Sequence, residues 1–235
     1  MPNESDVDIA VVREDLFEYA FGEKFRTSTE DQKEEAKTLK NAVERALRLF
    51  FPGQVRRGNK SLKVNGTDNR KPADVVPCFS MHYYYNSNLK DFVTHHDGII
   101  IFADDGTVIR NFPKQHIANG KSKNNQTNGN YKRMVRIIKK MRYLMSNCGY
   151  NCANNVSSFG LESLLWNIPN EIFNGYINYR FVFDELLQYL LKNQSNFSNY
   201  TEANGIKKLF PTQKDIEAYS TFISALNRFY EYDLQ

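Results

Sequence analysis

The pattern of hydrophobic and polar positions changes part-way along the chain. In the first half, apolar residues occur in short runs bounded by Gly, Pro, Asn or Asp, which is typical of β-strands. These runs predict strands at residues 5–12, 54–64, 71–79, 99–102 and 108–110. After Tyr131, apolar residues recur mostly at helical spacing. The sequence therefore predicts an α+β protein, with a mixed-sheet lobe followed by a helical C-terminal lobe.

One helix is predicted within the first half, at residues 31–51. Its apolar residues recur at steps of three and four, and Pro52-Gly53 ends it. The resulting stripe consists of Ala36, Leu39, Val43, Ala46, Leu47 and Phe50. Residues 14–30 are expected to form a polar and aromatic connection, and the Gly-, Asn- and Lys-rich residues 118–130 a loop. We place the domain boundary between 1–115 and 116–235, and expect a ligand-binding cleft between the two lobes.

Two aspartates stand at the start of the first predicted strand, in Ser5-Asp6-Val7-Asp8. Successive strand side chains point to opposite faces, so Asp6 and Asp8 share one face. The run from Ile9 to Val12 is apolar and mostly β-branched, as in a buried strand. Two carboxylates there are costly unless a cation lies between them, and Mg²⁺ prefers oxygen ligands. A solvated surface pair is the alternative interpretation.

A third aspartate, Asp74, lies in a second short apolar run bounded by prolines, which favour an edge strand or a strand end. If this strand lies beside the first, Asp74 joins Asp6 and Asp8. Three carboxylates can hold two Mg²⁺ ions about 3.5–4 Å apart for phosphoryl transfer. Alternatively, Asp74 caps a turn before Val75.

Composition narrows the classes of function. The chain has 31 basic and 27 acidic residues and a net charge of +4. This balance permits a phosphate-bearing substrate and does not require a nucleic-acid partner. No run approaches the roughly 20 apolar residues of a membrane span. Three cysteines without a signal peptide predict free thiols in the cytoplasm, and Cys148 and Cys152 lack the further ligands of a zinc site.

Several segments together resemble a known family. Residues 5–12 and 73–77 resemble the catalytic signature of the DNA polymerase β nucleotidyltransferase superfamily. Later segments narrow the resemblance to the bacterial cyclic-oligonucleotide synthases of antiphage defence, which are related to animal cyclic GMP-AMP synthase. These segments are residues 111–116, 128–136, 157–164 and 202–206. The resemblance covers nearly the whole chain.

The resemblance implies a function and a set of site residues. It implies that residues 1–115 form a nucleotidyltransferase lobe that makes cyclic di- or oligonucleotides from nucleoside triphosphates. Two Mg²⁺ ions, or Mn²⁺ in their place, would be bound by Asp6, Asp8 and Asp74, which would be the catalytic residues. The triphosphate would be held by Lys132, Arg136 and Ser158, and Phe159 would stack on the donor base. A monomer is expected.

Each of the nucleotide-binding assignments has a structural alternative. Lys132 and Arg136 lie one helical turn apart and share a face, which is otherwise a solvated cationic face. Lys139, Lys140 and Arg142 are expected to stay solvated. The serine and phenylalanine of Ser157-Ser158-Phe159 are otherwise an N-cap and a core residue. The histidines His95, His96 and His116 are expected to be structural.

One departure from the family bears on activity. Its members carry a Gly-Ser pair upstream of the Asp-x-Asp strand, where a helix N-terminus holds the triphosphate. Residues 1–5 do not supply this pair, nor is the family's N-terminal helix found. Weak or absent catalysis is therefore expected for the sequence as it stands. Two alternatives follow: a catalytically impaired nucleotide-binding relative, or a nucleotidyltransferase that acts on tRNA or protein.

Overall fold

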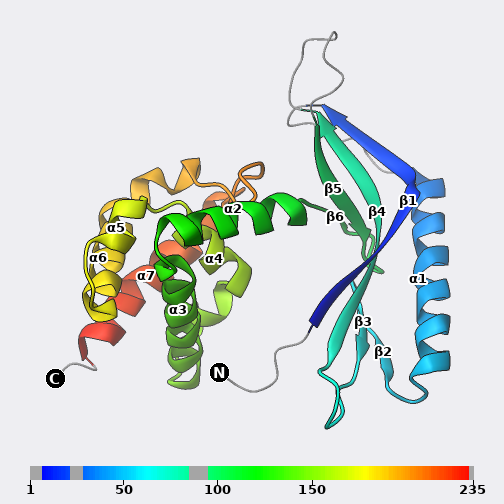
Figure 1. The fold of residues 1–235 in the computed structure, drawn as a ribbon, viewed down its shortest axis with the longest axis horizontal. Helices are drawn as coiled ribbons and strands as arrows, with labels where there is room; N and C mark the ends of the chain where they lie inside the picture. The colour runs from blue at the N-terminus through cyan, green and yellow to red at the C-terminus, as the bar shows by residue number, and fades with distance from the viewer. Residues whose placement is uncertain (1–6, 22–28, 85–94, 233–235) are drawn as a thin grey trace. The chain divides into compact units, whose positions relative to one another are not determined.

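The computed structural model describes residues 7–21, 29–84 and 95–232. The chain divides into two compact units, Met1–Pro113 and Lys114–Gln235 (Figure 1). The first is built on a β-sheet and the second is helical. The predicted α+β class, with a sheet unit followed by a helical unit, is therefore confirmed.

The sheet of the first unit is mixed, as predicted. Five strands lie in chain order with antiparallel pairing, and the first strand, β1 (Val7–Phe21), pairs in parallel with β4. The five are β2 (Val55–Arg57), β3 (Leu62–Val64), β4 (Ala73–Tyr84), β5 (His95–Phe102) and β6 (Val108–Asn111). The single strand expected at 54–64 is thus two strands, and the predicted pairing of 99–102 with 108–110 is confirmed.

The first strand differs from its prediction in length and burial. β1 continues to Phe21, where a connection from residue 14 was expected, because an irregularity between Arg13 and Glu18 lets the pairing with β4 resume. Its first half is not buried: Val7, Ile9 and Val12 are 47%, 44% and 37% exposed. Among the described strands β1 pairs only with β4. The side chains of β1 therefore have a neighbouring strand on one side only.

β4 lies in the interior of the sheet, so of the two positions that its prolines favoured the edge strand is wrong, whereas Pro72 does stand at a strand end, directly before Ala73. β4 pairs with β1 on one side and with both β3 and β5 on the other. Its pairing with β3 ends at Val75 and its pairing with β5 begins at Phe79. Pro77 lies in the gap between these two ladders, so a residue without an N–H interrupts neither of them.

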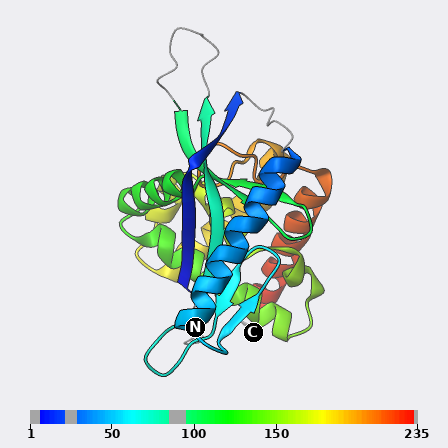
Figure 2. The same ribbon diagram turned by 90° about the vertical axis from the view of Figure 1, so that its right-hand side faces the viewer.

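Helix α1 (Glu30–Phe50) covers one face of this sheet (Figure 2). Thr29 and Gln32 form a capping box at its start. Most of the predicted apolar stripe packs on the strands, but Ala46 and Phe50 do not, since both are exposed and Phe50 is 81% exposed. Val43 and Leu47 pack on a cluster of buried strand residues, Val55, Leu62, Val64 and Val75. The buried Lys40 amine donates to the carbonyls of Gly58 and Asn59 and pairs with Asp104, which ties the helix to two turns of the sheet.

The helical unit packs around one large apolar core. Its helices are α2 (Pro113–Gln126), α3 (Asn130–Asn147), α4 (Ser158–Trp166), α5 (Asn170–Asn174), α6 (Tyr179–Lys192) and α7 (Gln213–Tyr232), with 3₁₀ turns η1 (Asn151–Asn155) and η2 (Gln194–Asn199). The core draws on α3, α4, α6 and α7 in particular, with Met134, Leu164, Leu186 and Phe222 all buried.

Helix α2 replaces the loop predicted at residues 118–130. Pro113 is its first residue, a position where proline's missing N–H costs nothing. Lys123 is buried, and its amine donates to the Ile168 carbonyl and to Asn170 Oδ1, 2.6 and 2.9 Å away. Burial lowers the pKa of this amine to about 8. The Lys- and Asn-rich composition therefore reflects polar contacts within the unit rather than an exposed loop.

Candidate active site

Two of the three predicted carboxylates are brought side by side by the sheet. In the parallel pairing of β1 with β4, Asp8 is the register partner of Asp74. On the other side of β4, Lys63 of β3 is also a partner of Asp74. Register partners project to the same face, so Lys63, Asp74 and Asp8 form a row across three strands. Leu62, Val64 and Val75 alternate with this row and contact the α1 side, so the row lies on the opposite face.

Asp74 carries an unsatisfied oxygen. Its Oδ1 atom is buried and has no hydrogen-bond partner among the described residues. The Lys63 amine lies 3.6 Å from Oδ1, which is too long for a hydrogen bond. A buried carboxylate oxygen without a donor is costly unless a cation satisfies it. Asp8 on the neighbouring strand is exposed, and Asp6 lies outside the described residues.

The donor set fits a hard divalent cation. Carboxylate oxygens from adjacent strands are the ligands that Mg²⁺ takes, together with water and substrate phosphates. The open, exposed position of Asp8 leaves room for such further ligands. The unsatisfied Asp74 oxygen is the observation on which this fit rests. The assignment of Asp6, Asp8 and Asp74 as metal ligands nevertheless stays a prediction.

The predicted phosphate-binding cations of the helical unit lie on the exposed side of α3. Met134, Val135 and Ile138 point into the core, as the amphipathic pattern predicted. Lys132 and Arg136 are exposed and lie one turn apart. Of the cations expected to stay solvated, Lys139 is instead paired with Glu162, and Arg142 donates to the Val156 carbonyl. Lys140 is exposed as expected, with its amine 5.4 Å from the centroid of the Tyr143 ring.

The start of α4 separates the two serines of Ser157-Ser158-Phe159. Ser157 is the N-cap, since its hydroxyl accepts the N–H of Gly160 at 2.9 Å. Ser158 is the first helical residue and is exposed. Phe159 is 46% exposed, so the alternative interpretation of Phe159 as a core residue is wrong. Its ring stacks on His116, with the ring centroids 5.0 Å apart.

A charged cluster next to Phe159 was not anticipated from the sequence. Glu162, one turn along α4, lies 2.6 Å from the Lys139 amine and 3.4 Å from His116 Nε2. The hydrogen bonds from His116 and Lys139 lower the pKa of Glu162 to about 2. His116 therefore links the acid to the exposed Phe159 ring. The spacing of Phe159 and Glu162 was visible in the sequence, but their partners come from other helices.

Cys78 of β4 contacts β1 within the strand pairing that makes Asp8 and Asp74 partners. Cys78 Sγ lies 3.6 Å from the Val11 carbonyl of β1, and burial raises the pKa of this thiol to about 11. Cys78 is thus an inert packing residue rather than a nucleophile. All three cysteines are free thiols.

Comparison with known proteins agrees with this arrangement. Residues 118–231 match the family model of the cGAS/DncV-like nucleotidyltransferase C-terminal helical domain. The chain is 39% identical over 236 residues to the cyclic GMP-AMP synthase CdnE03 of Staphylococcus schleiferi, covering 97% of this chain and 72% of that protein. It is 40% identical over 172 residues to a cyclic dipurine nucleotide synthase of Elizabethkingia meningoseptica, of which it covers 57%.

Solved structures extend the comparison to the fold. The cyclic dinucleotide synthase CdnE of Elizabethkingia meningoseptica, determined with GTP and Apcpp, matches with a TM-score of 0.79 and 34% identity. That match covers 96% of this chain and 78% of the other. The Rhodothermus marinus CdnE c-UMP-AMP synthase, determined with Apcpp and Upnpp, matches with a TM-score of 0.77 and 27% identity, covering 97% of this chain and 78% of the other.

Fold, site and relatives together define a nucleotidyltransferase, a class that is typically metal-dependent. The chain belongs to the cGAS/DncV-like nucleotidyltransferases, within the CdnE cyclic dinucleotide synthases. This family makes cyclic dinucleotide second messengers from nucleoside triphosphates and is associated with antiphage defence. Over the described residues, every helix is too short or too polar to cross a bilayer.

Proposed function

We propose that this chain joins two nucleoside triphosphates into a cyclic dinucleotide, and that Asp8 and Asp74, with Asp6, bind two Mg²⁺ ions for this reaction. Mn²⁺ would serve in place of Mg²⁺. The observation that carries the proposal is the register pairing of Asp8 with Asp74, whose Oδ1 atom is buried without a donor. The ions would supply charge neutralisation at the phosphates and at the attacking and leaving oxygens.

One carboxylate of the sheet unit would also act as a general base. An acceptor hydroxyl attacks the α-phosphate of the donor nucleotide, and pyrophosphate leaves. Asp74 is our candidate for accepting the proton of that hydroxyl, because its partly buried carboxylate has an oxygen free of donors. The Lys63 amine, 3.6 Å from this oxygen, places a positive charge beside the carboxylate.

The helical unit would contribute recognition of the nucleotide. Lys132 and Arg136 carry exposed positive charges on one face of α3 and would hold phosphate oxygens. Ser158, exposed in the first turn of α4, would donate its hydroxyl to a phosphate. The exposed ring of Phe159 would stack on a base, since its own position is fixed from the other side by His116.

The decisive experiment measures product formation by the purified chain. With radiolabelled nucleoside triphosphates and Mg²⁺, the wild type should release pyrophosphate and form a phosphatase-resistant cyclic product, whereas a catalytically impaired relative would bind nucleotide and form neither. Asp8→Asn and Asp74→Asn should each lower the rate at least about 100-fold, equivalent to about 2.7 kcal/mol of barrier. Asp68→Asn, at an exposed turn of the same unit, is the matched control and should keep wild-type activity. Equal rates in the Asp74→Asn variant and the wild type would refute the assignment.

Recognition by the helical unit is tested separately. Phe159→Ala should raise KM for the donor nucleotide with a smaller effect on kcat, because stacking is present before and during reaction. Phe181→Ala, which removes a 51% exposed ring from α6, is the control and should leave KM unchanged. A fall in kcat alone, with KM unaltered, would contradict a stacking role for Phe159.

A further inference from the structure

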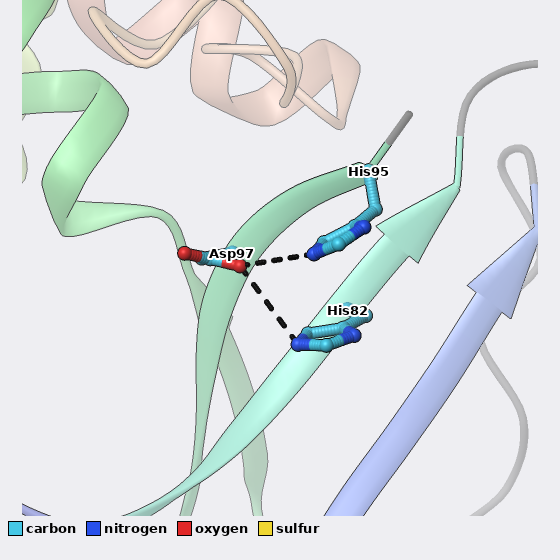
Figure 3. Close-up of side chains that lie close together, drawn as sticks. All are labelled: His82, His95 and Asp97. Carbon is cyan, nitrogen blue, oxygen red and sulfur yellow. Dashed lines mark ion pairs between the residues drawn. The ribbon is translucent and has the colours of Figure 1, made fainter. Parts of the chain in front are cut away.

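The β4–β5 hairpin brings together two histidines and an aspartate far from the predicted catalytic carboxylates. His82 of β4 is the register partner of Asp97 of β5. His95 precedes Asp97 by two residues on β5, so it projects to the same face. His96, between them, projects to the other face, where its ring stacks on Tyr83. Figure 3 shows the imidazoles of His82 and His95 both directed at the Asp97 carboxylate.

The ligand atoms of these three residues are spaced as around a single ion. His95 Nε2 lies 3.2 Å and His82 Nε2 lies 3.8 Å from the same oxygen, Oδ1 of Asp97. One ligand atom from each residue lies within 4.8 Å of the other two. Metal–ligand bonds of about 2.0–2.2 Å in a tetrahedral site place neighbouring ligand atoms roughly 3.3–3.5 Å apart. The observed separations bracket this value.

Further features favour a metal-binding site over a cluster of surface side chains. His82, His95 and Asp97 are 27%, 28% and 45% exposed, so an ion and its water can reach them without an entry path through the core. His95 Nδ1 is buried and has no hydrogen-bond partner among the described residues. The two imidazole rings are stacked with their centroids 4.0 Å apart, so both rings lie beside the same carboxylate.

We propose that His82, His95 and Asp97 form a binding site for Zn²⁺, completed by water. Two imidazoles and one carboxylate are a donor set that zinc accepts, whereas Mg²⁺ is bound chiefly by oxygen. The site is separate from the carboxylate row. Asp74 and His82 lie eight residues apart on one strand, which corresponds to about 26 Å at 3.3 Å per residue.

Binding requires a small local rearrangement. The imidazole rings are nearly parallel, with 20° between their planes, so one ring must turn until both Nε2 lone pairs meet at one point. Such rotation is available to partly exposed side chains. The ion would then cross-link β4 to β5 at His82 and Asp97, near the end of their described ladder. An ion that binds only the folded state stabilises it by RT ln(1 + c/Kd), where c is the concentration of free Zn²⁺, so the stability rises with the logarithm of the ion concentration above Kd.

The test titrates untagged, metal-free protein with Zn²⁺ and follows binding by calorimetry and by competition with a chromophoric chelator. One Zn²⁺ per chain should bind, and Co²⁺ should give the ligand-field spectrum of a four-coordinate site. His95→Ala and Asp97→Asn should each weaken Zn²⁺ affinity by at least about 10–100-fold. His96→Ala, which removes the neighbouring imidazole from the opposite face, is the matched control and should bind Zn²⁺ as the wild type does.

Two outcomes would overturn the proposal: no saturable Zn²⁺ binding to the wild type, or equal affinity in His95→Ala, Asp97→Asn and the wild type. Circular dichroism in chelator identifies any variant that fails to fold, and the Co²⁺ spectrum of the wild type then decides by itself. Asp74→Asn and excess Mg²⁺ should leave Zn²⁺ binding unchanged. Loss of Zn²⁺ in Asp74→Asn would place the ion at the carboxylate row and refute this site while leaving the proposed activity intact.

Discussion

Among single residues, Glu162 shows how a charge near Phe159, the proposed base-stacking residue, is held in place. Lys139 and His116 come from two other helices and both contact its carboxylate. Tyr131, from α3, donates its hydroxyl to the Glu162 backbone carbonyl at 3.0 Å. The exposed Phe159 ring rests on His116 and therefore depends on this cluster for its position.

Glu162→Gln should remove a stabilisation that depends on pH. The folded-state pKa of Glu162 is lowered to about 2, below the unfolded value of about 4.3, so the carboxylate favours folding above the unfolded pKa. That contribution is lost as pH falls from about 5 towards about 2. Urea unfolding of wild type and variant should therefore differ most near pH 6–7, and the two curves should converge below pH 3.

Glu217→Gln is the matched control for this measurement, because Glu217 is an exposed glutamate of α7 in the same unit. It should change the urea midpoint little at any pH. A stability difference between wild type and Glu162→Gln that is constant from pH 7 to pH 3 would show that the lost interaction is not with the ionised carboxylate.

At the scale of elements, two helical glycines of the same unit have opposite surroundings. A Cβ at Gly160 of α4 would overlap the Tyr219 hydroxyl and ring, because α7 packs closely there. A Cβ at Gly120 of α2 would meet nothing within 4 Å. Gly160 therefore allows close approach of two helices, whereas Gly120 is a residue of low helix propensity in open space.

Gly160→Ala should destabilise the protein by about 1–3 kcal/mol, since α4 or Tyr219 must shift to make room. Gly120→Ala is the matched control and should stabilise it by about 0.5–1 kcal/mol through helix propensity. Chemical denaturation of the two variants measures both effects. The same sign for both substitutions would contradict the packing described for Gly160.

The local sequence pattern predicted those elements whose residue spacing matches their packing. It missed those elements whose structure depends on contacts between residues far apart in the sequence. The apolar stripe of α1 and the hairpin of β5 with β6 needed only spacing and turn residues. Helix α2 was missed because its stability depends on buried polar contacts, such as those of Lys123. The length of β1 was missed because an irregularity in pairing with β4 lets a polar segment continue as strand.

The candidate site follows the same rule. Asp8 and Asp74 were predicted to lie together, and the sheet makes them register partners, although their role stays a prediction. The resemblance singled out Ser158 and Phe159, but spacing alone did not distinguish an exposed ring from a core one. The contacts of Glu162 with Lys139 and His116 join three helices, and no local sequence pattern encodes such a meeting.

At the scale of the whole molecule, the two units have separate apolar cores. Every residue of the large core, and every apolar residue packed against it, lies between Tyr131 and Tyr230. The sheet unit has two smaller clusters, one around Leu62 and Val75 and one around Phe79 and Ile100. The helical unit therefore contains the burial it needs without contributions from the sheet.

A fragment of residues 113–235 should consequently fold by itself. We expect a cooperative thermal transition by circular dichroism and dispersed amide resonances, since α2 keeps Pro113 as its first residue. Leu164→Ala within the fragment should lower its stability by about 2–5 kcal/mol, because Leu164 is fully buried. A fragment that melts without cooperativity and binds hydrophobic dyes would show that its core needs the sheet unit.

The parallel pairing of β1 with β4 determines which changes in chain length the carboxylate row can tolerate. Strand side chains alternate, so inserting or deleting one residue between Asp8 and Val11, whose carbonyl contacts Cys78, would turn Asp8 to the opposite side of the sheet. Parallel strands also need a long crossover, and here α1 belongs to it. Length changes in turns of that crossover leave the alternation intact. Natural insertions and deletions should therefore be more frequent in the turn after α1, at residues 51–54, than in the first residues of β1.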